Sequence, residues 1–135
     1  MLRAFIAGAA LLAASLPATA QSSINSANRT TYLGGYTAYI GERDLYNSDG
    51  ARLSEPWQII RQDRANYHRF RIRDRGDQGD SFFADANNRA AMERLLRSGT
   101  IANSAGRAIV QGNVFIQVDI YRGGDRDWVE VLILD

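Results

Sequence analysis

The stretch from Arg61 to Asp80, RQDRANYHRFRIRDRGDQGD, concentrates the residue types that can do chemistry. It holds the only histidine of the chain, His68, and six of the sixteen basic residues, all of which are arginine. Guanidinium groups bind phosphate, sulfate and carboxylate groups through paired hydrogen bonds, and an imidazole beside a carboxylate can act as a general base. The stretch therefore indicates either an anion-binding surface or an acid–base site.

A strand through this stretch would gather its arginines on one surface. If residues 67–75 are extended, alternate side chains point to the same side, and His68, Phe70 and Ile72 lie on the other side. The predicted ligand-binding residues are Arg69, Arg71, Arg73 and Arg75, with Tyr67 and Trp57 beside them. This arrangement predicts a cationic stripe that holds an anionic ligand.

The same arginines have a simpler interpretation as solvated side chains that pair with acids. Five carboxylates are close in sequence, namely Asp63, Asp74, Asp77, Asp80 and Asp85. Cleavage after residue 20 would also remove Arg3 and leave fifteen arginines against fifteen carboxylates. Nucleic acid is disfavoured as a partner, because surfaces that bind it keep an excess of positive charge.

Catalytic and metal-binding roles rest on few residues. His68 is the candidate general base, with Asp63 or Asp74 to orient its ring, but no Gly-x-Ser-x-Gly pattern supplies a nucleophile. Asp74, Asp77 and Asp80 are candidate ligands for a divalent cation, although their spacing differs from that of an EF-hand loop. The chain has no cysteine and one histidine, which disfavours a zinc site. We expect no cofactor.

The first twenty residues have the features of an export signal. A charged start at Arg3 precedes an apolar run and a small-residue cleavage site that ends at Ala20. The run of about thirteen residues is too short to cross a membrane. We expect a secreted or periplasmic protein after cleavage near Ala20, with a loose arm over residues 21–31 and a single domain over residues 32–135.

Strands are predicted in the first half of that domain. Residues 36–53 predict a hairpin, because β-branched and aromatic residues lead into Asp49-Gly50, a pair that tolerates positive φ angles. Residues 57–73 predict two further strands separated by a turn at Ala65-Asn66.

The second half combines a helix with strands. Residues 81–99 predict a helix that Ser81 or Asp85 caps and Gly99 ends. Residues 114–121 and 128–135 alternate apolar and polar side chains, and with residues 109–110 they predict a three-stranded antiparallel meander.

This order of elements predicts an α+β fold with a small antiparallel sheet, partly closed into a barrel, and one packed helix. In architecture alone it resembles an oligonucleotide/oligosaccharide-binding barrel. We expect an exported, non-enzymatic binding or interaction module whose partner is an anionic ligand or an envelope protein. The alternatives are a small hydrolase or nuclease-like enzyme that uses His68 with nearby Asp and Arg residues, and a structural subunit that pairs through an edge strand.

Two further patterns leave their interpretation open. Asp119 and Glu130 lie on the last two predicted strands and could act on sugars as a carboxylate pair, or simply be exposed. Aromatic residues cluster in the first half of the chain, at Tyr32, Tyr36, Tyr39, Tyr46, Trp57 and Tyr67. They are suited either to a binding platform for sugars, peptides or bases or to packing within the core.

Overall fold

The structure, a computed structural model, describes residues 29–135. The predicted export signal, residues 1–20, and residues 21–28 of the predicted arm lie outside the described residues. Thr30 and Thr31, which the sequence-based prediction assigned to the arm, are already part of the first strand.

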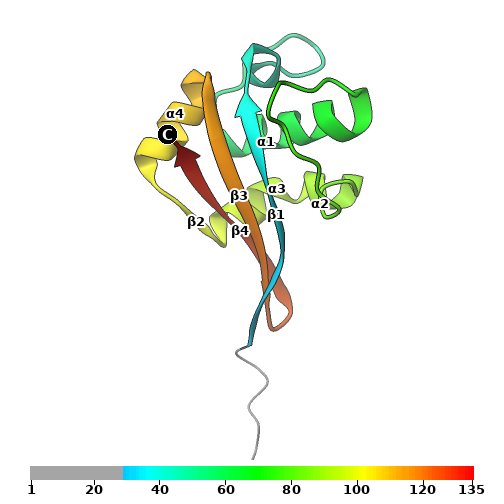
Figure 1. Cartoon of the computed structure of the whole chain (residues 1–135), viewed down its shortest axis with the longest axis vertical. Coiled ribbons are helices and arrows are strands. Elements are labelled where there is room, and N and C mark those ends of the chain that lie inside the picture. Colours follow the sequence, from blue (N-terminus) through cyan, green and yellow to red (C-terminus); the bar gives the residue numbers. More distant parts are fainter. Residues whose placement is uncertain (1–28) are drawn as a thin grey trace, which may run out of the picture.

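A four-stranded sheet forms one layer of the molecule (Figure 1). Its spatial order is β1 (Thr30–Ile40), β3 (Val114–Gly123), β4 (Arg126–Leu134) and β2 (Thr100–Ile101). β1 and β4 are antiparallel to β3, whereas the short β2 is parallel to β4. The α+β class is confirmed. The partly closed barrel is not, because this mixed sheet is open, with β1 and β2 as its two edges.

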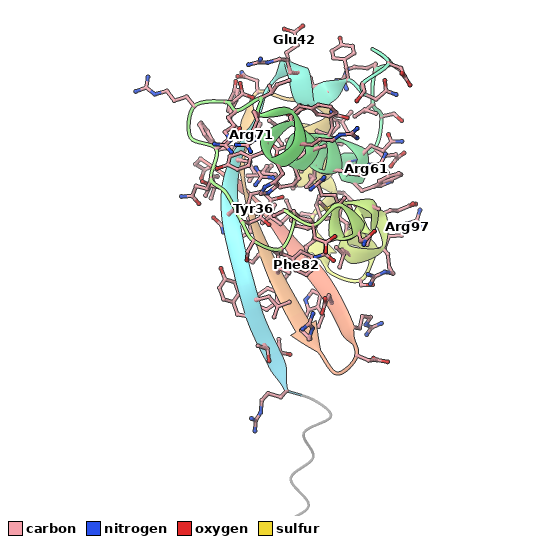
Figure 2. The ribbon with its side chains drawn as sticks, turned by 90° about the vertical axis from the view of Figure 1, so that its right-hand side faces the viewer. Tyr36, Glu42, Arg61, Arg71, Phe82 and Arg97 are labelled. Atoms are coloured by element: carbon pink, nitrogen blue, oxygen red, sulfur yellow. The ribbon has the colours of Figure 1, made fainter. Side chains whose placement is uncertain are left out.

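Helices form the second layer, on one face of the sheet. They are η2 (Glu42–Leu45), α1 (Pro56–Ala65), the π-helical turn η3 (Asn66–Phe70), α2 (Ala86–Ala90), α3 (Met92–Arg97) and α4 (Asn103–Gln111). Figure 2 shows the three long strands side by side, with the helices over the upper part of the sheet. Between residues 29 and 135, no helix combines the length and apolarity that a membrane crossing requires.

Alternate residues of the three long strands build the core against these helices. The buried strand residues are Tyr36, Ala38, Ile40, Ile116, Val118, Ile120, Val129 and Val131. The helix layer and the adjoining loop contribute Ile59, Ile60, Phe83, Met92, Leu95 and Ile109. The alternation predicted for residues 114–121 and 128–135 is thus confirmed.

The prediction of two strands over residues 57–73 is wrong, because this segment forms α1 and η3. Pro56 occupies the first turn, and the Oε1 atom of Gln58 accepts a hydrogen bond from the Glu55 amide at 3.1 Å. The buried face of α1 begins with Ile59 and Ile60 but continues one turn later with the polar residues Asp63 and Arg64. The helical period was therefore hidden from an analysis of apolar residues.

The hairpin predicted over residues 36–53 is reduced to one isolated bridge, between Tyr46 and Arg52. The chain does turn at Gly50, where φ is 80°. The bridge is short because β1 ends at Ile40 and η2 follows, so no second strand runs back along β1.

Two other elements differ from the prediction. Residues 109–110 belong to α4 and not to a strand, so the predicted three-stranded meander does not form. The second antiparallel partner of β3 is instead β1. The helix predicted over residues 81–99 is divided into α2 and α3 at Ala91, which has φ −83° and ψ 4°. The cap at Asp85 is confirmed, since its side chain accepts a hydrogen bond from the amide of Asn87 at 2.7 Å.

Candidate functional site

The arginine-rich segment is a helical turn followed by a loop, and the prediction of a strand with a stripe along one face is wrong. Arg69 lies in η3, which ends at Phe70, and the next residue, Arg71, has the left-handed conformation, with φ 58° and ψ 30°. The amide of Ile72 donates back to the carbonyl oxygen of Asn66 at 2.8 Å, as expected at the end of a helical turn. We refer to residues 69–80 as the arginine loop.

The far end of the arginine loop is fastened to the outer edge of β1. The backbone amide of Gln78 donates to the carbonyl oxygen of Thr37 at 2.9 Å, and the backbone amide of Thr37 donates to the side-chain Oε1 of Gln78 at 3.0 Å. The amide of Tyr39 donates to Oδ1 of Asp77 at 2.8 Å. These bonds satisfy part of the strand edge and hold the loop in place.

Arg64, a fully buried residue of α1, is the second anchor of the loop. Its Nη1 atom donates to the carbonyl oxygen of Gln78 at 2.9 Å and to Oδ1 of Asp80 at 3.0 Å. Its Nε atom donates to Oδ2 of Asp63 at 2.7 Å. The Cζ atom lies 3.8 Å from the centroid of the Tyr36 ring, which Figure 2 shows between sheet and helix layer. Arg64 is therefore a structural cation, not part of a binding surface.

The environment of this cation is strongly desolvated. Burial raises the pKa of Asp63 to about 8, because desolvation outweighs the attraction of the Arg64 guanidinium. Burial also raises the pKa of the Tyr36 hydroxyl. A perturbed carboxyl group can mark an active site, but here it lies within the core beside its ion-pair partner.

His68 pairs with Asp80 and with neither of the two acids predicted to orient it. Its Nε2 atom lies 2.9 Å from Oδ1 of Asp80, the oxygen that also accepts from Arg64. The other oxygen of Asp80 accepts from the amide of Phe83 at 2.5 Å. Among residues 29–135, no serine or threonine hydroxyl is hydrogen-bonded to His68.

The exposed arginines of the loop have no acidic partners in the part of the chain that the structure describes. Arg69, Arg71, Arg73 and Arg75 are exposed, and none of them forms an ion pair with another described residue. Two of them lie over aromatic rings. The Cζ atom of Arg73 is 4.0 Å from the centroid of Tyr67, and that of Arg69 is 5.0 Å from the centroid of Phe70.

The five carboxylates that were expected to neutralise these arginines have other partners. Asp63 and Asp80 pair with Arg64, and Asp74 lies 3.9 Å from Arg43. Asp77 accepts from the backbone amides of Tyr39 and Asp74, and Asp85 accepts from the backbone amide of Asn87. The interpretation of the arginines as one half of a set of local ion pairs is therefore wrong. The charges balance along the sequence but not in space.

Two other sequence-based predictions for this region fail. Asp74, Asp77 and Asp80 do not form a cluster that could hold a metal ion, and no other such cluster exists within residues 29–135. Trp57 lies in the first turn of α1, roughly 14 Å along the helix axis from the start of η3, so it does not flank the arginine loop. Its ring lies beneath Arg61 instead, with the Cζ atom at 5.1 Å.

Two pockets, each of about 530 Å³, adjoin the arginine loop. Phe70 and Ile72 form part of the lining of one, together with Tyr46, Gln62 and Asn66. The other is lined by Asp74, Arg75 and Gly76 of the loop and by Tyr39 and Phe115 of the sheet. Neither pocket is predictable from local sequence patterns, because its residues come from separate segments.

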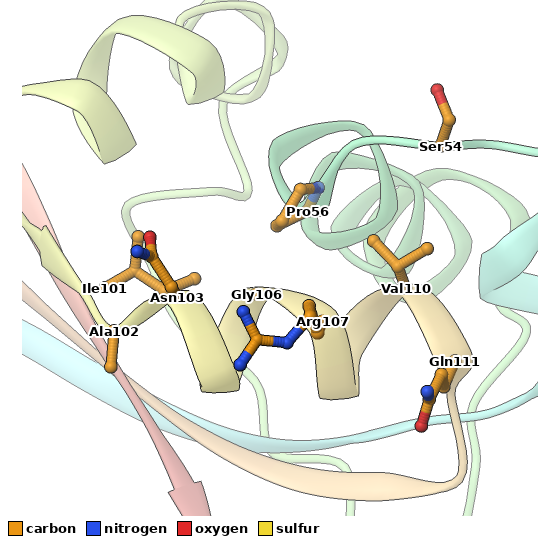
Figure 3. A pocket seen from close by; sticks show the side chains of 9 residues that line it. All are labelled: Ser54, Pro56, Ile101, Ala102, Asn103, Gly106, Arg107, Val110 and Gln111. Atoms are coloured by element: carbon orange, nitrogen blue, oxygen red, sulfur yellow. The ribbon is translucent and has the colours of Figure 1, made fainter.

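A further pocket of about 530 Å³ lies between the start of α1 and α4 (Figure 3). Pro56 and Val110 contribute apolar surface, and Arg107 is the only ionisable residue in its lining.

Comparison with known proteins does not assign the chain, since no family model, no curated protein and no solved structure matches it. The function of the protein is therefore inferred from the geometry of the arginine loop.

Proposed function

We propose that the protein is a non-enzymatic binding module and that its arginine loop binds an anionic ligand. One observation carries this proposal: four exposed guanidinium groups lie within seven residues, and none is paired with an acid of the described chain. Like charges held close together repel one another and create a positive potential. An anion that binds among them relieves that repulsion.

The anchoring of the loop supports this proposal. Gln78 and Asp80 fix one end of the loop to Arg64, and Asp77 fixes it to β1. A loop that is already ordered loses less conformational entropy when a ligand binds. The left-handed backbone of Arg71 fits the same interpretation, because strained residues concentrate at binding sites.

The chemistry of the side chains defines the ligand class. Guanidinium groups recognise phosphate, sulfate or carboxylate groups, which accept two parallel hydrogen bonds from each fork. One of the two neighbouring pockets presents Phe70 and Ile72, so it suits a ligand with an apolar part beside its anionic groups. With the export signal expected at residues 1–20, the periplasm or the cell exterior is the proposed location of this ligand.

Two charge-matched variants test the proposal. The loop variant replaces Arg69, Arg71, Arg73 and Arg75 with glutamine. The control variant makes the same change at four exposed arginines that form no ion pair within residues 29–135, namely Arg29, Arg94, Arg107 and Arg126. Both variants lose the same net charge, so any difference between them reports the position of the charges.

The measurement is the salt concentration at which each protein elutes from heparin-agarose. We expect wild type and control to elute later than the loop variant, because the loop supplies the guanidinium groups that contact sulfate. Circular dichroism checks that all three proteins are folded. Elution of the two variants at the same salt concentration would contradict the proposal.

A further inference from the structure

The face of the sheet opposite the helices carries large apolar side chains. Helices cover only the other face, and the ends of β1, β3 and β4 nearest the β3–β4 turn extend past the helix layer (Figures 1 and 2). The outward side chains include Tyr32, Tyr39, Phe115, Tyr121, Trp128, Leu132 and Leu134. Tyr32 is 58% exposed and Leu132 is 61% exposed. In register, Asp119 and Glu130 lie between Tyr32, Tyr121 and Trp128 and the other apolar residues of this face. Exposed apolar surface with polar residues at its rim usually marks an interaction site.

Three aromatic rings form a row across this face. Tyr32, Tyr121 and Trp128 are paired in register on neighbouring strands. The ring centroids of Tyr32 and Tyr121 are 5.6 Å apart at an interplanar angle of 60°. Those of Tyr121 and Trp128 are 5.8 Å apart and stacked, at 21°. The row presents electron-rich ring surface, which attracts cations.

Two carboxylates lie directly beside the aromatic row. Asp119 and Glu130 are cross-strand partners, and neither forms an ion pair with any residue from 29 to 135. Oδ1 of Asp119 accepts from the Tyr32 hydroxyl at 3.3 Å and from Nε2 of Gln117 at 2.9 Å. Like charges directly opposite each other destabilise a sheet, so a cation bound here would relieve repulsion.

The row and the acids are built as one unit. A Cβ atom at Gly35 would lie 2.4 Å from Oδ1 of Asp119 and 2.7 Å from the Tyr32 hydroxyl, so glycine makes their contact possible. The pKa values of Tyr32 and Tyr121 are raised, first by desolvation and then by the charge of Asp119. Both shifts agree with a negative potential over the row.

We propose that this face docks a basic, extended peptide segment of another protein. Lysine or arginine side chains of the segment lie over the rings of Tyr121 and Trp128 and pair with Asp119 and Glu130. The unpaired acids select a basic partner over a neutral one by charge complementarity. The row crosses three strands of an uncovered face, which fits an extended ligand better than an isolated small cation.

A second copy of the chain fits this face less well. In a face-to-face dimer with two-fold symmetry, the same patch contacts itself, so Asp119 and Glu130 of both copies would enter one interface. Such a contact adds like-charge repulsion in a desolvated interface.

The test compares an isosteric neutral variant with a matched control. D119N/E130Q removes both charges of the face, whereas D49N/E42Q removes one aspartate and one glutamate from exposed positions in the segment between β1 and α1. The probe is a fluorescein-labelled peptide of alternating lysine and threonine, eight residues long, and its acidic counterpart has glutamate for lysine. Fluorescence anisotropy measures binding, and analytical ultracentrifugation measures the mass of the protein alone.

We expect the basic peptide to bind wild type and D49N/E42Q and to lose affinity at least about tenfold on D119N/E130Q. A W128L variant, which keeps both acids, should also bind more weakly because it lacks the stacked ring. Equal affinity of the peptide for D119N/E130Q and the control would overturn the proposal. Tighter binding of the neutral sugar cellohexaose than of the peptide would also overturn it. So would a dimer of the protein alone that W128L abolishes, because a second copy would then occupy this face.

Discussion

Replacing Arg64 with methionine tests how the arginine loop is held. Methionine keeps much of the length and the apolar contact of the arginine stem but removes the cation. Asp63 and Asp80 then remain in the interior without their common partner. The carbonyl oxygen of Gln78 also loses its donor. We therefore expect the R64M variant to be destabilised and its arginine loop to be released from α1.

The magnitude follows from the burial of these groups. Breaking a buried ion pair by removal of one partner typically costs about 3–5 kcal/mol, because the remaining charge is uncompensated. The Nη2 atom of Arg64 has no partner in the described chain, so its removal adds no lost hydrogen bond. We expect a decrease of about 4 kcal/mol in the free energy of unfolding at pH 8.

The loss should depend on pH in a defined direction. A carboxyl group whose pKa is raised in the folded state stabilises the fold when protonated, and this stability is lost as pH rises through the folded pKa. The pKa of Asp63 is already raised by burial, and removal of Arg64 raises it further. Above pH 8, Asp63 ionises in wild type beside Arg64 but stays protonated in R64M, so only R64M keeps losing stability as pH rises. The difference between R64M and wild type should therefore be smaller at pH 8 than at pH 10.

Guanidinium chloride unfolding at both pH values measures the effect, with R61M as the control. Arg61 lies on the same helix but is exposed, so R61M should stay within about 0.5 kcal/mol of wild type. Hydrogen exchange of the Thr37 and Tyr39 amides, which donate to Gln78 and Asp77, should accelerate in R64M. If R64M does not fold, the double variant R64M/D63N should recover part of the stability, because it also removes the carboxyl group of Asp63 that R64M leaves without its ion-pair partner. A loss below about 1 kcal/mol, or equal loss at both pH values, would refute the reasoning.

Two further substitutions test other buried contacts. Burial raises the pKa of Asp44 to about 6, although its oxygens accept from Asn66 and from the amide of Gly41. Asp44 should thus lower the free energy of unfolding of wild type by up to about 3 kcal/mol as pH rises from about 4 to 6. Thermal melts of D44N at the same pH values should lack this contribution. The same pH dependence in D44N and wild type would contradict the raised pKa of Asp44. At Gly99 an added Cβ atom would lie 1.6 Å from the carbonyl oxygen of Val129. G99A should therefore be destabilised by about 1–3 kcal/mol in the same melts, and a wild-type melting temperature would show that the backbone is not so close.

The C-terminal part of the fold was predictable because its pattern is simple. Residues 114–121 alternate apolar and polar side chains, and the structure buries Ile116, Val118 and Ile120 as expected. Residue type and position predict Ser81 or Asp85 as a cap, and the structure has Asp85 in that role. These features depend on local periodicity, which a single sequence shows directly.

The region of the candidate site was not predictable in the same way. Asp63 and Arg64 are polar residues at buried helix positions, so the helical period of α1 is absent from the apolar residues alone. The partner that determines their burial, Asp80, lies sixteen residues further along the chain. Charges counted along the sequence indicated mutual neutralisation, whereas the fold assigns the acids to Arg64 and to backbone amides. Ion pairing depends on tertiary contacts, and sequence spacing does not specify them.

A single titration can show whether the four exposed arginines of the loop form one anion-binding surface. Nuclear magnetic resonance follows the arginine Nε–Hε groups while pyrophosphate is added to the protein. We expect saturable shifts at Arg69, Arg71, Arg73 and Arg75, with Arg64 unchanged because its Nε donates to Asp63. Shifts of equal size at the control arginines Arg94 and Arg107 would show nonspecific attraction to the whole surface and would contradict the proposed anion-binding surface.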